Sequence, residues 1–489
     1  MHFSPGYTDC LTRYRPTRQS LDRWAEAVND SSYSFDEVWP YYQRSPRLTP
    51  PNVDRRLANA TTLYNASAFN PSGGPLDVSY SNFVMPFSTW MGQGMEAIGL
   101  PEASDFNSGK LFGYQYCTST IRPKDQSRSS SESSFLRESD TPNLRVYTNT
   151  LAKRILFDEE KNAIGVEISG SRQLTANKEV IVSAGVFQSP QLLMVSGLGP
   201  IEHLQEFNIT VLSDLPGVGQ GMLDHPFFAP SYRVGLETLT RVATHPLHLA
   251  SEYLRWATKS EGIFASPVAD FLGWEKIPEE FRGAFSEGTR QNLSRFTEDW
   301  PEVEYISGAG YIGNASNLLL DQPNDGHEYA SMLGVLITST SHGTVTLASA
   351  DISDLPIINP NWLDTESDGQ LAIALFKRIR QAFGSNQMDP IVIGEEYNPG
   401  PEVQTDDEIL DWIRNNLMTL WHPSRTCKMG TVNDLMAVVD SKARVFGVNR
   451  LRVVDASAFP FLPPGHPQST CYMLAEKIAV DILDGDGDI

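Results

Sequence analysis

Residues 178–200 read KEVIVSAGVFQSPQLLMVSGLGP, and this stretch sets the expected fold class. The apolar run Val180–Ser183 is typical of a buried strand. It meets a glycine turn, and we expect a helix to follow, with Gln188 or Ser189 near its start and Gly197 and Gly199 beyond its end. A strand, a tight turn and a helix in this order form the repeating piece of a parallel α/β sheet.

A second unit of this kind closes the chain. RLRVVDASAFP (450–460) reads as a strand that feeds a loop, and TCYMLAEKIAVDIL (470–483) reads as an amphipathic helix. Residues 144–169 alternate apolar and polar residues around a turn, which predicts a β-hairpin or meander. The middle of the chain, about 230–400, mixes helical stretches with strands such as YASMLGVLITST and GTVTLAS. The pattern therefore predicts a mixed α/β fold.

The bulk composition limits the partners. The chain has 489 residues and a formal net charge of −22. Such an acidic surface repels the phosphates of nucleic acids and anionic lipids, so we expect a small-molecule partner and no nucleic acid. No apolar run approaches the ~20 residues of a membrane span. The four cysteines form no Cys-x-x-Cys pair, and we expect no metal site.

Glycosylation signals give an expectation about the compartment. Six Asn-x-Ser/Thr sequons favour a secreted, glycosylated protein. The opening stretch MHFSPGYTDCLTRYRPT has no apolar segment of the kind that a secretory signal carries. We therefore expect a protein of the secretory pathway without a signal peptide in this chain, or otherwise a cytoplasmic one. The sequons are at Asn29, Asn59, Asn65, Asn208, Asn292 and Asn314.

Several separate motifs, taken together, resemble the glucose–methanol–choline (GMC) family of flavin oxidoreductases. The stretch 178–200 is similar to the family's second signature, and LPGVGQGMLDHP (215–226) to its Pro-Gly-Val-Gly turn. SHGTVTLASADISDLPIINPNWL (341–363) resembles a strand pair of the substrate domain. WHPSRTCKMG (421–430) and GHPQSTCYMLAEKIA (465–479) fit the C-terminal catalytic block. The motifs occur in the family's order, and the likeness runs from about residue 11 to the end.

The front of the chain departs from the family pattern. Family members begin with a strand–GxGxxG–helix unit that cradles a dinucleotide pyrophosphate, about ninety residues before the segment that LTRYRPTRQSLDRWAEAV (11–28) resembles. GVGQGM (217–222) is remotely similar to the fingerprint, but it lacks the third glycine and opens no βαβ unit. We therefore expect a GMC chain that lacks its N-terminal dinucleotide-binding unit.

The resemblance implies two discontinuous domains. An incomplete Rossmann-like FAD-binding domain is expected over residues 1–45, 135–230 and 405–489. A substrate-binding domain, built on an antiparallel sheet, is expected over residues 46–134 and 231–404.

Two histidines stand in similar Pro/Gly/Ser/Thr loops, and they are the candidate catalytic residues. Oxidation of an alcohol needs a base within hydrogen-bond reach of the hydroxyl, and a histidine with a pKa of ~6.5 suits this role. The resemblance places His422 at the family's base and His466 at the position that hydrogen-bonds the alcohol oxygen. The alternative is that each is a loop histidine satisfied by backbone carbonyls. His225, in the Asp-His-Pro turn, is expected to be structural.

The resemblance also implies FAD as the cofactor. Residues 455–457 would meet its ribityl–pyrophosphate region through backbone amides, and 467–470 precede a helix whose dipole would face the isoalloxazine carbonyl. The start of the hairpin would give backbone contacts to adenine. Simple loop geometry is the alternative explanation for each position. The expected cofactor-binding residues are Ala152, Asp455, Ala456, Ser457, Pro467, Gln468 and Thr470.

VDASAFPFLPPGHPQST (454–470) resembles the secondary-metabolite branch of the family, of the patulin synthase and versicolorin B synthase type. We therefore predict FAD-dependent oxidation of an alcohol on such a scaffold, with proton abstraction at His422, hydride transfer to flavin N5, and O₂ or another electron acceptor. Aromatic segments around Trp274, Tyr305–Tyr311 and Trp362 are expected to wall the pocket, and Trp421, next to His422, is expected to stack on a ring substrate, with core packing as the alternative for each tryptophan. Two alternatives stay open: a non-redox cyclase or lyase on the same scaffold, and a non-catalytic fragment unable to hold FAD.

Overall fold

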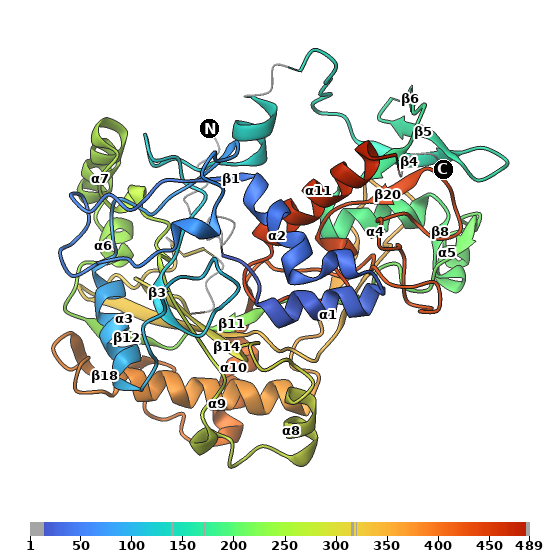
Figure 1. Ribbon diagram of the computed structural model, residues 1–489. Helices are drawn as coiled ribbons and strands as arrows, with labels where there is room; N and C mark the ends of the chain where they lie inside the picture. The colour runs from blue at the N-terminus through green and yellow to red at the C-terminus, as the bar shows by residue number, and fades with distance from the viewer. Residues whose placement is uncertain (1–13, 138–140, 171, 314–316, 319, 486–489) are drawn as a thin grey trace.

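The computed structural model describes residues 14–137, 141–170, 172–313, 317–318 and 320–485 (Figure 1). Its largest element is an eight-stranded sheet in which every paired strand is antiparallel. The order is β18-β12-β15-β14-β13-β3, and β11 pairs with both β15 and β19. The strands are β3 (Gly113–Tyr116), β11 (Pro226–Phe228), β12 (Ser231–Val234), β13 (Phe271–Glu275), β14 (Val303–Gly308), β15 (Glu328–Leu336), β18 (Val392–Asn398) and β19 (Met418–Thr419). The expected antiparallel sheet is confirmed.

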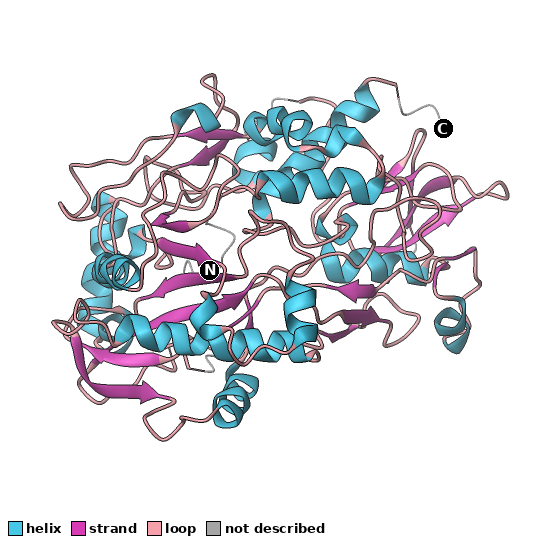
Figure 2. Ribbon diagram, turned by 60° about the horizontal axis from the view of Figure 1, so that its bottom comes forward, coloured by secondary structure: helices cyan, strands magenta, loops and turns pink. Residues whose placement is uncertain are grey.

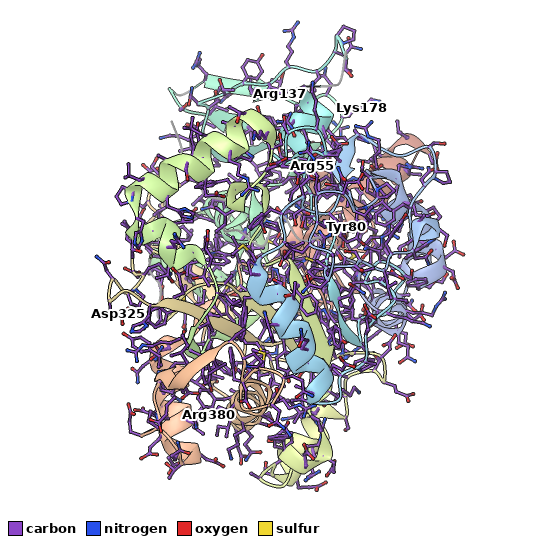
Figure 3. All side chains as sticks on the ribbon, turned by 90° about the vertical axis from the view of Figure 1, so that its left-hand side faces the viewer. Arg55, Tyr80, Arg137, Lys178, Asp325 and Arg380 are labelled. Carbon is purple, nitrogen blue, oxygen red and sulfur yellow. The ribbon has the colours of Figure 1, made fainter. Side chains whose placement is uncertain are left out.

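Both faces of this sheet are covered. Successive side chains of a strand point to opposite faces, so Val303 and Tyr305 of β14 pack in the core on the helical side, whereas Ile306 packs on the other. Helix α9 runs along the helical side and packs on β15 (Figure 1). Arg380 of α9 forms an ion pair with Glu396 of β18, at 2.6 Å (Figure 3). The helices of this region are α3 (Pro86–Ala97), α6 (Leu239–Thr244), α7 (Pro246–Lys259), α8 (Glu287–Leu293), α9 (Glu366–Phe383) and α10 (Asp406–Asn416).

The two strand–turn–helix units come together as one parallel pair. β7 (Val180–Val182) pairs with β20 (Leu451–Val453), and α4 (Gly185–Val195) follows β7. The helix starts three or four residues earlier than the expected position at Gln188 or Ser189. The reason lies far away in the sequence: the carboxylate of Asp455, after β20, accepts hydrogen bonds from the Gly185 amide and the Ser189 hydroxyl. A cap supplied by another unit leaves no local signal.

The expected hairpin is a three-stranded meander of β4 (Ala152–Phe157), β5 (Ala163–Ile168) and β6 (Arg172–Thr175). It lies at the opposite side of the molecule from α6 and α7 (Figure 1). Helices α1 (Arg18–Val28) and α2 (Phe35–Arg44) precede it in sequence, and α2 packs against the final helix α11 (Gln468–Leu483).

Smaller sheets complete the architecture, and Figure 2 shows their short strands among the helices. The pairs are β1 (Pro46–Leu48) with β2 (Leu76–Val78), β8 (Leu198–Gly199) with β9 (Ser213–Asp214), and the group β10 (Gln220–Met222), β16 (Gly343–Thr346) and β17 (Ile357–Asn359); α5 (Ile201–Glu206) follows β8. No helix in the described ranges combines the length and the apolar character that crossing a bilayer requires. The exact domain boundaries stay a prediction.

Candidate active site

The two candidate histidines come from loops at opposite ends of the C-terminal block. His422 follows β19, and His466 lies just before α11. Their ring centroids are 4.4 Å apart and the rings are tilted by 59°. Both side chains are buried. The fold therefore brings the expected pair into one interior site.

A third histidine joins them. Nδ1 of His225, in the loop between β10 and β11, lies 3.0 Å from Nδ1 of His422. Asp224 ties the two loops together, because its Oδ1 accepts hydrogen bonds from the backbone amides of both histidines and its Oδ2 accepts one from the Thr419 hydroxyl. The sequence analysis assigned His225 to a structural turn and missed this contact, which spans 197 residues.

Burial controls the protonation of this cluster. It lowers the pKa of His422 well below 6.5, and the charges of His466 and His225 act in the same direction. Burial and then the charge of His466 lower the pKa of His225 to about 3. Burial also raises the pKa of Asp224 to about 6, against its hydrogen bonds. His422 is consequently neutral near pH 7 and has a free lone pair to accept a proton.

A buried carboxylate faces the other catalytic candidate. Glu304 of β14 points to the same side of the sheet as Ile306, where its Oε1 lies 3.2 Å from Nε2 of His466. The hydroxyl of Tyr14 donates to the same oxygen at 2.9 Å. Burial raises the pKa of Glu304 well above its usual range. Its strand is buried along its whole length, but in the sequence a single acid within a strand is a common pattern, so Glu304 could not be singled out.

Aromatic side chains form one wall of the site. Tyr14 packs against His466 with ring centroids 4.4 Å apart, and Trp274 lies 6.4 Å from the same histidine. Trp421 is 42% exposed beside Phe227. Trp274 and Trp421 thus lie near the histidines, and their expected roles toward a substrate stay a prediction. The expectation for Tyr305 is wrong, because Tyr305 belongs to the helical face of the sheet and donates to Glu275.

The loop after β20 offers backbone donors beside the start of α4. The Asp455 carboxylate accepts from the Ser457 amide at 2.7 Å, so that amide is already engaged. The amides of Asp455 and Ala456 donate to no group among the described residues. Two adjacent free amides beside a helix N-terminus suit an anionic group such as a pyrophosphate.

The start of α11 and the edge of the meander complete the expected cofactor positions. Pro467 is the N-cap of α11 and gives it no side-chain hydrogen bond, and the positive end of the helix dipole lies at this point. The Thr470 hydroxyl is 3.0 Å from the Tyr42 hydroxyl, and Gln468 donates to Thr120 at 3.4 Å. Ala152 begins β4, an edge strand with one unpaired side. These donors and acceptors fit a flavin dinucleotide. Within the described ranges, no group of His, Cys, Asp and Glu side chains is arranged to hold a metal ion.

Comparison with known proteins decides the family. Residues 9–227 match the N-terminal model of the GMC oxidoreductases, and residues 339–475 match the C-terminal model. The chain belongs to the GMC oxidoreductase family. It is therefore an oxidoreductase, and the family cofactor is FAD.

Individual relatives show which members of the family the chain is similar to. The chain is 48% identical to patulin synthase of Aspergillus clavatus over 96% of its own length and 75% of that protein. It is 40% identical to versicolorin B synthase of Aspergillus parasiticus, over 96% of its own length and 73% of that protein. Among solved structures, an FAD-dependent oxidoreductase from Chaetomium thermophilum matches with a TM-score of 0.84 at 24% identity, over 98% of this chain and 85% of that one. This last likeness shows the shared fold.

Proposed function

We propose that this oxidoreductase removes hydrogen from an alcohol, with His422 as the base. The observation that carries the proposal is the buried pair of rings, 4.4 Å apart. Nε2 of His422 has no hydrogen-bond partner among the described residues, and its low pKa leaves it unprotonated. A neutral imidazole nitrogen beside a second imidazole can accept the hydroxyl proton while the second ring orients the oxygen.

FAD, when bound, would supply the hydride acceptor. His466 binds the alcohol oxygen opposite His422 and is itself positioned by Glu304. Glu304 shares its Oε1 between His466 and the Tyr14 hydroxyl, so the imidazole has a fixed orientation. The buried carboxyl also gives that imidazole a nearby place to exchange a proton.

The substrate class is proposed from the relatives and the aromatic wall. Proteins named patulin synthase and versicolorin B synthase are the relatives at 48% and 40% identity. Tyr14, Trp274 and Trp421 present aromatic surface near the histidines. A ring-bearing alcohol on a secondary-metabolite scaffold suits such surfaces.

The test is anaerobic reduction of the FAD-loaded protein by cyclic alcohols, followed as bleaching of the flavin absorbance. The His422→Ala variant should reduce its flavin about 10²–10⁴-fold more slowly. His327→Asn, at an exposed position, is the matched control and should behave as wild type. Near-normal reduction by His422→Ala would reject the role of His422. Product formed from substrate without any bleaching would instead support the cyclase or lyase alternative.

A further inference from the structure

A cavity of about 470 Å³ adjoins the cluster of three histidines. It is bounded by α1, by the segment after α8 and by the loop that carries His422. Neither His422 nor His466 lines it, but His225 does. Phe296, Trp300 and Phe461 give it an apolar wall. The volume is in the range of small-molecule pockets.

Three arginines line this cavity, and none of them forms an ion pair with a described carboxylate. Arg23 lies over the rings of the apolar wall, at 5.6 Å from the Phe461 centroid. Arg425 donates to the backbone carbonyls of Pro460 and Gly221. Arg295 is the third. Burial lowers the pKa of both Arg23 and Arg425, which reflects the cost of holding these charges away from water.

The carboxylate of Asp224 in the lining offsets one positive charge but forms no ion pair with any of the three arginines. Asp224 already accepts three hydrogen bonds from the two histidine amides and Thr419. Lys428, a further cation of the lining, is paired with Asp434. In a chain with a net charge of −22, a cavity with three unpaired guanidiniums is a local excess of positive charge. Guanidinium groups in partly dry surroundings favour planar anions such as carboxylates.

The backbone at Arg425 supports a role for its side chain. Its φ is +77°, in the left-handed region that is unfavourable for a non-glycine residue. Glycine would relieve this strain. The position instead keeps a long cationic side chain that reaches the cavity.

The histidine contact points to an acceptor in the same cavity. For Nε2 of His422 to serve as the base, its Nδ1 must carry the hydrogen and donate it to Nδ1 of His225. His225 must then carry its own hydrogen on Nε2. That nitrogen is buried and has no hydrogen-bond partner in the part of the chain that the structure describes, while the ring lines the cavity. The site therefore lacks an acceptor beside three unpaired cations.

We infer that this cavity binds a small organic anion, a carboxylate on an apolar ring, which accepts hydrogen bonds from the arginines and from Nε2 of His225. Its apolar body packs on the wall formed by Phe296, Trp300 and Phe461. Binding of the anion to the arginines is independent of the proposed function, whereas the hydrogen bond from His225 rests on it, because the tautomer of His225 follows from the role of His422 as the base. The effect of the anion on His422, which is to fix the tautomer that exposes the basic Nε2, rests on that function.

Isothermal titration of the full chain tests the binding, with benzoate as the probe and benzyl alcohol as its neutral counterpart. Benzoate should bind at least about tenfold more tightly, because charge-assisted hydrogen bonds need the carboxylate. Arg295→Gln and Arg425→Gln should each weaken benzoate binding by about tenfold or more. Arg137→Gln removes an equal charge at a peripheral position (Figure 3) and should leave the affinity unchanged. Equal binding of the two probes, or unchanged affinity in both cavity variants, would overturn the inference.

The hydrogen bond to His225 has a separate readout that does not require turnover. With ¹⁵N-labelled histidine, benzoate should shift one ring-nitrogen signal that is absent from His225→Asn. Binding with no shift of that signal would overturn the contact with His225. If benzoate binds and shifts the His225 signal as expected but the FAD-loaded protein does not oxidise alcohols, only the proposed function is contradicted.

Discussion

Replacement of Asp224 by asparagine should remove a pH-dependent loss of stability. Burial raises the pKa of Asp224 from 3.8 to about 6 in the folded protein. A group with a raised pKa contributes stability that is fully present below its unfolded value and is lost as the pH rises through its folded value. The difference between 3.8 and about 6 corresponds to about 3 kcal/mol over that range. Asparagine carries no charge at any of these pH values, so it causes no loss of unfolding free energy as the pH rises.

The side-chain geometry makes asparagine a fair replacement. Its oxygen can accept from the amides of His225 and His422, as Oδ1 of Asp224 does. Its amide nitrogen can donate to the Thr419 hydroxyl, which now donates to Oδ2. The low pKa values of His225 and His422 oppose this trend, because those groups lose stability as the pH falls. Asp224 is not among the causes of either shift, so their contribution cancels between the two proteins.

The assay is equilibrium urea unfolding of both proteins at pH 4 and pH 7. Between these values, the wild-type protein should lose about 2 kcal/mol more unfolding free energy than Asp224→Asn. The rest of the loss of about 3 kcal/mol occurs at pH values outside the range from 4 to 7. An equal change with pH in both proteins would refute the reasoning, because it would mean that Asp224 titrates in the fold as it does in the unfolded chain.

Three further substitutions test other parts of the argument. Glu304→Gln keeps the side-chain shape but removes the carboxyl that can exchange a proton with His466. It should lower kcat by at least about tenfold and change the pH profile of kcat, whereas the flavin spectrum should stay unchanged. Gly219→Ala places a methyl group 2.1 Å from the Val345 carbonyl oxygen and should cost several kcal/mol in thermal unfolding, whereas Gly99→Ala, with a similar φ and nothing within 4 Å, should cost about 1 kcal/mol. Trp421→Ala should raise KM for ring alcohols with little change in kcat, and an equal loss in kcat would contradict a binding role.

The sequence predicted those parts of the fold whose signals are local. The run 178–200 carries its own strand, turn and helix, and β7 and α4 follow it closely. The predicted start of α4 was wrong by three or four residues because its cap, Asp455, comes from the other end of the chain. Likewise, the pairing of β7 with β20 joins segments about 270 residues apart, and only the repeated strand–helix pattern suggested it.

In the candidate site, too, the sequence predicted the residues that carry a local signal and missed the others. His422 and His466 could be found because each sits in a loop motif of recognisable composition. Glu304 and His225 could not, since a single acid in a strand and a histidine beside an aspartate are common patterns. Their importance comes from contacts across 162 and 197 residues.

The loop motif around His422 does not determine the pKa of its imidazole. A histidine in an exposed loop keeps a pKa of ~6.5 and is half protonated near that pH, so it would be a poor base in acid. His422 has a much lower pKa because the sheet, the neighbouring loops and two other imidazoles surround it. Those surroundings are assembled from β14, the turn after β10 and the start of α11. The same ten residues around His422 would behave differently on another scaffold, so the reactivity belongs to the fold and only the reacting group belongs to the motif.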